Sequence, residues 1–233
     1  MNAKIYIPAR LESTRLERKL LQDVNGKPLI VRTVDRALQT GLPIDVVTDS
    51  EEIEQVIVDN YADDVGVFWL SKTPHENGTQ RIAEAVSLDD AIPDIVINWQ
   101  ADEPMLNVDD VKYMPSMLQS SGCDIFTFVY EDDDKFDKGN PDIVKVATDA
   151  RSRALYFSRA PIPHGTGRYF GHVGVYAYRR EVLLELAKLR LTHVSKALNS
   201  CAGWRTGIRS PSDRPASRLP RSIRHLIFRD TGS

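Results

Sequence analysis

The feature that most constrains the fold of this chain is a regular alternation of apolar strands and amphipathic helices over residues 4–130. Between the apolar runs, apolar residues recur at helical spacing. The runs with strand character are Lys4–Pro8, Ile44–Thr48, Val65–Leu70, Asp94–Trp99 and Asp124–Tyr130. This alternation predicts βαβ units. We therefore expect a three-layer, Rossmann-like α/β fold with a mostly parallel sheet covered by helices on both faces.

The rest of the chain has strand and helix character in shorter pieces. Further strands are expected at 144–146, 154–157 and 172–178, and an amphipathic helix at 181–189. The 233 residues suffice for one full core, and an apolar content of 42% is typical of a soluble globule. No stretch is apolar enough to cross a bilayer, and the two cysteines form no CxxC pair. We expect a cytoplasmic protein without a zinc knuckle or a disulfide framework.

Parallel sheets bind ligands beyond the carboxyl ends of their strands, which here points to the loops after Pro8, Thr48 and Trp99. The first loop is cationic and contains Arg10, Ser13, Thr14, Arg15, Arg18 and Lys19. Guanidinium, ammonium and hydroxyl groups are the donors that a triphosphate needs. The loop matches neither GxxxxGKS nor GxGxxG. Its composition alone fits a phosphate site and a solvated basic loop equally well.

Two carboxylates, Asp102 and Glu103, follow directly after a buried strand. Mg²⁺ prefers oxygen ligands and shares them with substrate phosphates and water, so Asp102 suits a metal site. The alternative is that one of the two carboxylates caps the next helix, which fits Glu103 better than Asp102.

Two further polar groupings are weaker signals. Gly78 and Arg81 stand at the start of an expected helix, where glycine and threonine are also ordinary capping residues. Arg159, His172 and Tyr176 could bind a carboxylate and hydroxyls, and His172 and Tyr176 share one face of a strand. Taken alone, a histidine and a tyrosine on a strand are more often satisfied core groups.

In this order, the motifs resemble the 3-deoxy-manno-octulosonate cytidylyltransferase family, whose members make CMP-Kdo for lipopolysaccharide. The matching segments span most of residues 4–197. They are Ile7–Lys19 (IPARLESTRLERK), Asn25–Ile30 (NGKPLI), Val47–Asp49, Gly78–Ala83 (GTQRIA), Val96–Pro104 (VINWQADEP), Asn140–Pro163 and His172–Tyr178 (HVGVYAY). The LYFSRA and HxGxY segments distinguish this family from other nucleotidyltransferases.

The resemblance implies an α/β nucleotide-diphospho-sugar transferase fold, a homodimer, and a magnesium-dependent reaction between CTP and a Kdo-type sugar acid. It assigns phosphate-binding and catalytic roles to Arg10, Arg15 and Lys19, and a metal-ligand role to Asp102. Selection of cytosine and ribose is assigned to Ala9, Gly78 and Arg81, and binding of the sugar acid to Gln100, Arg159, His172 and Tyr176.

The chain departs from the family pattern at three places. The usual Pro-Gly before the loop lysine is Glu17-Arg18, and the glycine before the metal aspartate is Ala101. The insertion between LYFSRA and HxGxY is short. These departures affect the phosphate loop, the sugar site and the dimer geometry.

The composition changes abruptly at residue 198. Residues 198–233 contain seven arginines, two aspartates, no lysine and no glutamate, a net charge of +5, whereas residues 1–197 sum to −8. We therefore predict a cytidylyltransferase domain at 1–197, with the sugar-binding and dimer region at about 140–180, and an atypical arginine-rich tail at 198–233.

A one-base deletion near codon 199 would explain the tail. The family ends with a helix that begins LEQLR and a later VDTPEDL segment, and this chain has neither. Codons for residues 198–207 can be chosen so that one base inserted after the codon of Leu198 makes the segment read LEQLRWLEDG. In the same frame, Arg221–Phe228 can read VDTPPDL. The missing segments supply sugar contacts and a second magnesium aspartate in the family, so we expect nucleotide binding to survive and turnover to be impaired.

Two alternatives stay open at this point. The first is a cytidylyltransferase for another acid, such as an 8-amino or sialic-like acid. The second is an inactive nucleotide-binding protein whose basic tail binds nucleic acid. The tail has few aromatic residues, so stacking on bases is not indicated, and we expect neither a nucleic-acid nor a membrane partner.

Overall fold

The computed structural model describes residues 2–11, 18–62, 64–70, 75, 77–131, 137–149, 153–165, 169–188, 205–207 and 223–229. Its contacts divide the chain into two compact units. The first comprises Met1–Pro115 and Tyr178–Ala187, and the second comprises Ser116–Ala177 and Lys188–Ser233. The boundary predicted at residue 198 from composition is a different one. It concerns the coding origin of the tail and not how the tail packs, so it stays a prediction.

A parallel sheet forms the centre of the first unit. Its strand order is β6 (Ile95–Trp99), β1 (Ala3–Ala9), β4 (Ile44–Thr48) and β5 (Gly66–Trp69). All three pairings are parallel, with Ala3 opposite Ile95 and Ile5 opposite Ile44. Because β1 and β6 are almost wholly buried, both read as continuous apolar runs, which is typical of parallel strands covered on both faces.

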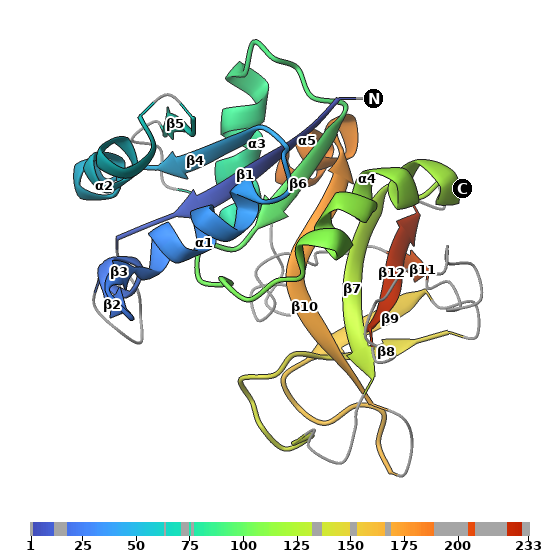
Figure 1. Ribbon diagram of the computed structural model, residues 1–233. Coiled ribbons are helices and arrows are strands. Elements are labelled where there is room, and N and C mark those ends of the chain that lie inside the picture. The colour runs from blue at the N-terminus through green and yellow to red at the C-terminus, as the bar shows by residue number, and fades with distance from the viewer. Residues whose placement is uncertain are drawn as a thin grey trace. The chain divides into compact units, whose positions relative to one another are not determined.

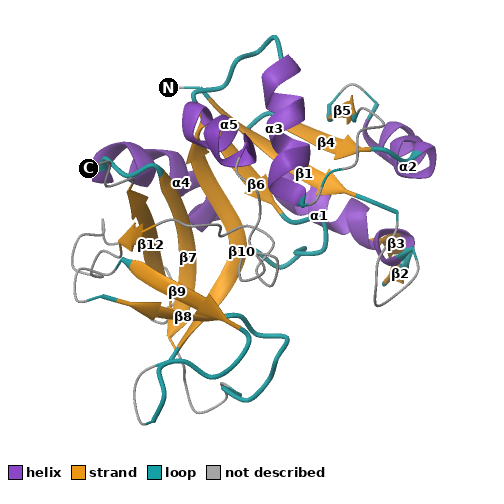
Figure 2. Cartoon of the chain, turned by 180° about the vertical axis from the view of Figure 1, so that it is seen from behind, coloured by secondary structure: helices purple, strands orange, loops and turns teal. Residues whose placement is uncertain are grey.

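Helices cover both faces of this sheet. Figures 1 and 2 show α1 (Leu29–Leu38) on one face and α3 (Gly78–Leu88) on the other. Ser50 caps α2 (Glu51–Tyr61) by accepting a hydrogen bond from the Ile53 amide, and Asn77 caps α3 in the same way. The expected α/β fold is confirmed.

The cap of α4 (Val108–Ser121) corrects one alternative. The side chain of Asn107 accepts hydrogen bonds from the amides of Asp109 and Asp110, at 2.9 and 3.4 Å. Neither Asp102 nor Glu103 caps this helix, since the helix begins at Val108, five residues after Glu103. The first unit also contains most of α5 (Arg180–Lys188), and within the described residues no helix is long and apolar enough to span a membrane.

Four strand pairings of the second unit are antiparallel. Its strands are β7 (Ile125–Glu131), β8 (Lys145–Thr148), β9 (Ala154–Ser158), β10 (Phe170–Arg179, with its last two residues in the first unit), β11 (Arg205–Gly207) and β12 (Ile223–Arg229). β8 pairs with both β9 and β10, and β12 pairs with both β7 and β11. The expected mostly parallel sheet is confirmed, and its parallel pairings lie in the first unit.

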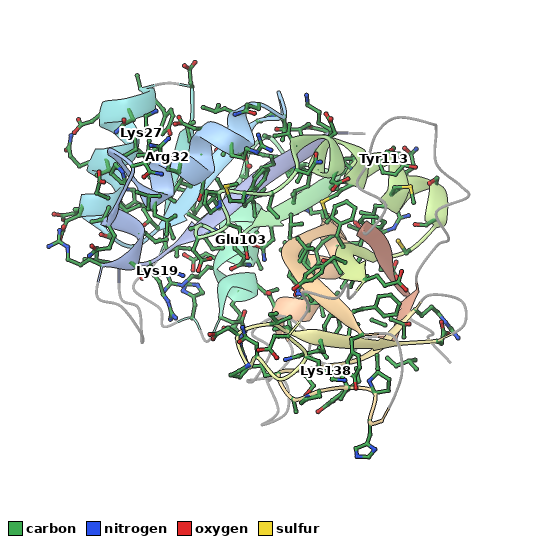
Figure 3. All side chains as sticks on the ribbon, turned by 60° about the horizontal axis from the view of Figure 1, so that its bottom comes forward. Lys19, Lys27, Arg32, Glu103, Tyr113 and Lys138 are labelled. Atoms are coloured by element: carbon green, nitrogen blue, oxygen red, sulfur yellow. The ribbon has the colours of Figure 1, made fainter. Side chains whose placement is uncertain are left out.

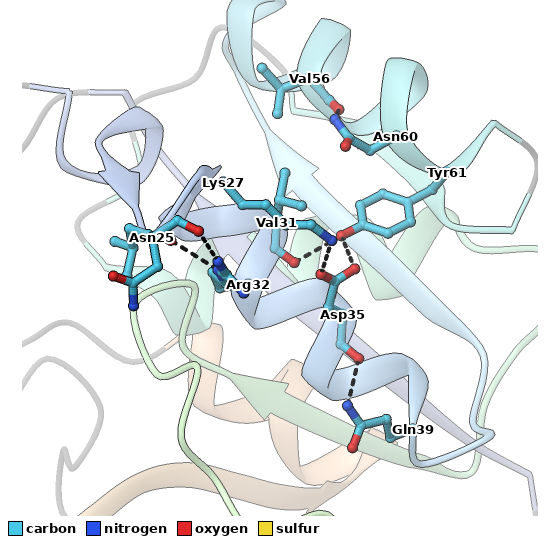
Figure 4. A network of polar contacts seen from close by, with 10 residues as sticks. Asn25, Lys27, Val31, Arg32, Asp35, Gln39, Val56, Asn60 and Tyr61 are labelled. Carbon is cyan, nitrogen blue, oxygen red and sulfur yellow. Dashed lines mark hydrogen bonds and ion pairs between the residues drawn. The ribbon is translucent and has the colours of Figure 1, made fainter.

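A small hairpin follows the cationic loop, after the short helix η1 (Lys19–Leu21). Its strands are β2 (Asp23–Val24) and β3 (Lys27–Pro28), and its turn lies at Asn25 and Gly26, both with positive φ. Arg32 of α1 donates to the carbonyls of Val24 and Asn25 (Figure 4). These bonds fix the point at which the loop rejoins the domain.

Candidate active site

The cationic loop leaves β1 at the carboxyl edge of the parallel sheet. Ala9, the last residue of β1, is fully buried, and Arg10 is exposed. The chain is described again from Arg18, which has a left-handed backbone (φ 53°) and forms an ion pair with Glu52. Arg15, Ser13 and Thr14 lie outside the described residues, so their roles stay predictions.

Lys19 and Asp102 meet at this edge. The Nζ atom of Lys19 lies 2.5 Å from Oδ2 of Asp102, and both side chains are about two-fifths exposed. β1 and β6 are parallel neighbours, so the loop after each strand emerges at the same edge. The sheet thus brings together a phosphate-binding candidate and a metal-ligand candidate that are far apart in the sequence.

The turn that carries Asp102 is fixed by buried contacts. Thr33 of α1 donates to the carbonyl of Ala101 (2.8 Å), and Trp99 donates from its indole N–H to the carbonyl of Glu103 (2.9 Å). Burial, and then the neighbouring Asp102 carboxylate, raise the pKa of Glu103. Figure 3 labels Glu103 and Lys19, which lie near one another. The turn therefore holds Asp102 outward while Glu103 is partly withdrawn from water.

The beginning of α3 adds two polar groups to the same edge. Arg81 pairs with Asp49, at 3.1 Å, yet its Nη1 atom and the hydroxyl of Thr79 are buried without a hydrogen-bond partner within the described residues. Such groups cost about 1–3 kcal/mol each unless something pairs with them, so this edge is suited to a polar ligand. Gly78 lies beside Pro8, but an added Cβ would lie 3.5 Å from its ring, so the fold itself does not require glycine there.

The donor set fits a magnesium ion that is shared with a substrate. Asp102 supplies an accessible carboxylate, and within the described residues no group of three or more His, Cys, Asp or Glu side chains could hold a metal ion. Mg²⁺ commonly uses one or two carboxylates and completes its shell with phosphate oxygens and water. Asp102 fits that role beside Lys19.

The four residues expected to bind the sugar acid are divided between the units. Gln100 belongs to the first unit, where its amide donates to Asn98 (3.2 Å). Arg159, His172 and Tyr176 belong to the second. The rings of His172 and Tyr176 have centroids 5.0 Å apart, which confirms that they share a face, and Arg159 donates to the carbonyl of Pro141.

Two buried polar residues of the second unit were missed by sequence reasoning. Lys145 is fully buried, and its ammonium group donates to the carbonyls of Asn140 (2.5 Å) and Arg159 (2.9 Å). Thr127 is also fully buried and lies 3.1 Å from Nε2 of His172. A lysine or threonine within an apolar strand was the available signal, because buried polar groups need partners.

The fold and the site together define a nucleotidyltransferase: a parallel α/β sheet with a cationic loop and an accessible carboxylate at its carboxyl edge. A family model described as cytidylyltransferase matches residues 5–202. The 3-deoxy-manno-octulosonate cytidylyltransferase of Chelativorans sp. is 39% identical over 194 residues, covering 78% of this chain and 76% of the relative. That of Chlorobium limicola is 39% identical over 210 residues, covering 84% and 81%. The chain belongs to the family of 3-deoxy-manno-octulosonate cytidylyltransferases.

One solved structure agrees with this assignment, and a more distant one shares only the fold. The structure of CMP:2-keto-3-deoxy-manno-octonic acid synthetase complexed with CTP is 36% identical, with a TM-score of 0.73, and the match covers 84% of this chain and 82% of that one. A cytidylyltransferase from Leptospira borgpetersenii shares the fold, at 19% identity and a TM-score of 0.52, over 86% and 68% of the two chains.

Proposed function

We propose that this chain couples CTP to 3-deoxy-manno-octulosonate and releases pyrophosphate. The observation that carries the proposal is the meeting of Lys19 and Asp102 at the carboxyl ends of β1 and β6. A cation for phosphate and a carboxylate for a metal are the two groups that nucleotidyl transfer needs side by side. Its relatives are named for this reaction, and one solved relative is described as complexed with CTP.

The transfer would proceed by in-line displacement at the α-phosphorus of CTP. The anomeric hydroxyl oxygen of the sugar acid forms the new bond to phosphorus as the bond to the β-phosphate oxygen breaks. Pyrophosphate leaves with the electron pair, and the hydroxyl proton passes to solvent. Arg10, Arg15 and Lys19 neutralise the phosphate oxygens, so positioning and electrostatics supply most of the rate.

Magnesium is part of the proposal. Asp102 would hold the ion beside Lys19, and when bound the ion would supply charge stabilisation on the phosphates. Asp102 and Lys19 form an ion pair in the structure, so Lys19 is free to turn toward phosphate once the carboxylate has another cation. Thr79 and Arg81 supply buried donors for the nucleoside that have no partner in the described part of the chain, alongside the backbone at Ala9 and the close approach at Gly78.

Binding of the sugar acid is proposed for Gln100, Arg159, His172 and Tyr176. Arg159 is the cation of this set, so it would receive the carboxylate. Burial lowers the pKa of His172 to about 3, so the imidazole is neutral at neutral pH. It would therefore form a hydrogen bond with a polar group of the sugar acid rather than an ion pair. The proposal also includes a homodimer that acts in the cytoplasm in lipopolysaccharide synthesis, as the family resemblance implies.

The test is pyrophosphate release from four nucleoside triphosphates, each with 3-deoxy-manno-octulosonate, its 8-amino analogue or a sialic acid, with and without Mg²⁺. We expect activity with CTP and 3-deoxy-manno-octulosonate, dependent on Mg²⁺. Because the altered tail would reduce turnover, CTP binding is measured in parallel by calorimetry. A preference for another acid, or CTP binding no tighter than GTP binding, would contradict the proposal.

A further inference from the structure

The Thr127 hydroxyl on β7 has three polar neighbours, all in the second unit. The Oγ1 atom lies 2.5 Å from the carbonyl oxygen of Val175 and 3.2 Å from that of Val173. It also lies 3.1 Å from the Nε2 atom of His172. The Thr127 side chain is fully buried, so water does not compete for these contacts.

The arrangement of these neighbours determines where the hydrogens lie. A threonine hydroxyl has one hydrogen and two lone pairs, and a carbonyl oxygen can only accept. The hydroxyl therefore donates to a carbonyl, the nearer being that of Val175, and can only accept from His172. Nε2 of His172 must then carry the hydrogen. The ring is neutral, since burial lowers its pKa to about 3, so it is the tautomer protonated at Nε2 alone.

The second ring nitrogen is left as an acceptor. Nδ1 of His172 has no hydrogen-bond partner among the described residues, and the residue is only partly buried. The ring is held between Phe157, edge-on at 5.3 Å between centroids, and Tyr176, at 5.0 Å. An unprotonated Nδ1 attracts a hydrogen-bond donor and repels a carboxylate oxygen.

We propose that Thr127 is a positioning residue that holds His172 in the Nε2-protonated form, so that Nδ1 accepts a hydrogen bond from a hydroxyl group of the substrate. This assigns a hydroxyl, and not the carboxylate, to His172. The assignment of the ligand as a sugar acid rests on the proposed function. The tautomer of His172 and its dependence on Thr127 do not rest on the proposed function, because they follow from contacts within this chain.

The tautomer is tested by ¹⁵N NMR of the full chain labelled at histidine, with the signals of His172 identified by their absence in His172→Gln. In the unaltered chain we expect a protonated Nε2 and an unprotonated Nδ1 at neutral pH. Thr127→Ser keeps the hydroxyl and should keep this pattern. Thr127→Val keeps the shape but removes the acceptor, so we expect the two tautomers to mix. A ring protonated at Nδ1 in the unaltered chain would overturn the positioning role.

The ligand is tested by adding 3-deoxy-manno-octulosonate in the presence of CTP. We expect the Nδ1 signal to move upfield, as for a nitrogen that gains a hydrogen bond. The dissociation constant of the sugar acid should rise about fivefold to tenfold in Thr127→Val, the loss of roughly one neutral hydrogen bond. That of CTP should stay unchanged in both variants, and thermal unfolding shows whether the variants stay folded.

The outcomes separate the two proposals. If the sugar acid binds but the Nδ1 signal stays in place, the hydroxyl assignment is wrong, whatever the tautomer. If the sugar acid does not bind and another acid does, the proposed function is wrong, while the tautomer pattern across the three chains still decides the role of Thr127. A tautomer that is unchanged in Thr127→Val contradicts that role directly.

Discussion

At the scale of single residues, Asp102 carries the sharpest prediction. Asp102→Asn keeps the size of the side chain but removes the charge that holds a divalent cation and that pairs with Lys19 at 2.5 Å. We expect Mg²⁺ to strengthen CTP binding in the unaltered chain but not in this variant, and turnover to fall at least about a hundredfold. Calorimetry with and without Mg²⁺ measures the first effect, and pyrophosphate release the second.

The neighbouring carboxylate provides the matched control. Glu103 lies in the same turn, but its pKa is raised by burial and by Asp102, which makes it the poorer ligand for a cation. Glu103→Gln should therefore keep the effect of Mg²⁺ on CTP binding. If the two variants behave alike, the metal role does not belong to Asp102 specifically.

A second residue-scale prediction concerns alkaline stability. Lys4 donates to Asp45 (2.7 Å) and Asp89 (2.8 Å), and the Tyr6 hydroxyl also donates to Asp89. Burial and Asp89 raise the pKa of Tyr6, and the carboxylates outweigh burial to raise the pKa of Lys4. Both groups keep their protons to higher pH when folded, so their stabilisation is complete below about pH 10 and is lost as pH rises through the raised pKa values.

Tyr6→Phe tests this sign. The variant should lose about 1–3 kcal/mol at neutral pH, because Asp89 loses a donor. Its free energy of unfolding should then fall less steeply above about pH 10 than that of the unaltered chain. Urea unfolding at several pH values measures the slope, with Tyr156→Phe on an exposed side chain as the control. Equal slopes in Tyr6→Phe and the unaltered chain would show that Tyr6 has no part in the loss.

Residue identity alone predicted only part of the site. The proximity of Lys19 and Asp102 could be predicted from the sequence, because the loops that follow parallel strands emerge at the same edge of the sheet. The contacts of Thr127 and Lys145 could not, since their partners are His172 and backbone carbonyls of β10 and of the residues before β8 and after β9. No periodicity predicts which carbonyl a buried side chain meets.

At the scale of elements, Lys145 links two loops of the second unit. Its ammonium group joins the carbonyl of Asn140 to that of Arg159, and the Arg159 guanidinium donates back to Pro141. Burial lowers the pKa of Lys145, and among the described residues no carboxylate forms an ion pair with it. Lys145 thus orders the segment that presents Arg159.

Lys145→Met should therefore weaken binding of the sugar acid more than it weakens the fold. Loss of two hydrogen bonds from a charged donor is partly offset by removing a desolvated charge, so we expect a stability loss of about 1–3 kcal/mol. The dissociation constant of the sugar acid should rise about tenfold, and that of CTP should not change. Lys138→Met, on an exposed lysine of the preceding loop, is the control. A parallel loss of CTP binding would indicate general unfolding instead.

The elements themselves were largely predictable in the first unit. The apolar runs expected at Lys4–Pro8 and Ile44–Thr48 match β1 and β4 within one residue at each end. The cap of α4 was not predicted, because Asn107 is less conspicuous than the carboxylates Asp102 and Glu103 that precede it. No strand direction was predicted for 144–146, 154–157 or 172–178, since an apolar run fits a parallel and an antiparallel strand alike.

At the scale of the whole molecule, the resemblance to the family ends close to the composition break at residue 198. The match to the cytidylyltransferase model ends at residue 202. Of the arginine-rich segment, the structure describes the backbone of β11 and β12, and β12 pairs antiparallel with β7 from Ile223 to Phe228. An apolar run such as IRHLIF can pair with a strand edge whatever its coding origin, so this pairing leaves the reading-frame hypothesis a prediction.

The nucleotide sequence of the gene decides that hypothesis first. We expect the frame that lies one base away to be open after codon 198 and to encode LEQLR and then VDTPPDL. A chain rebuilt in that frame should bind CTP within about threefold of the present one, because Lys19, Arg81 and Asp102 all precede the break. It should turn over at least about a hundredfold faster, since a second carboxylate would hold the metal from the other side. Pyrophosphate release and calorimetry on both chains measure these effects. Stop codons in that frame, or equal turnover by the two chains, would make the present tail the functional one.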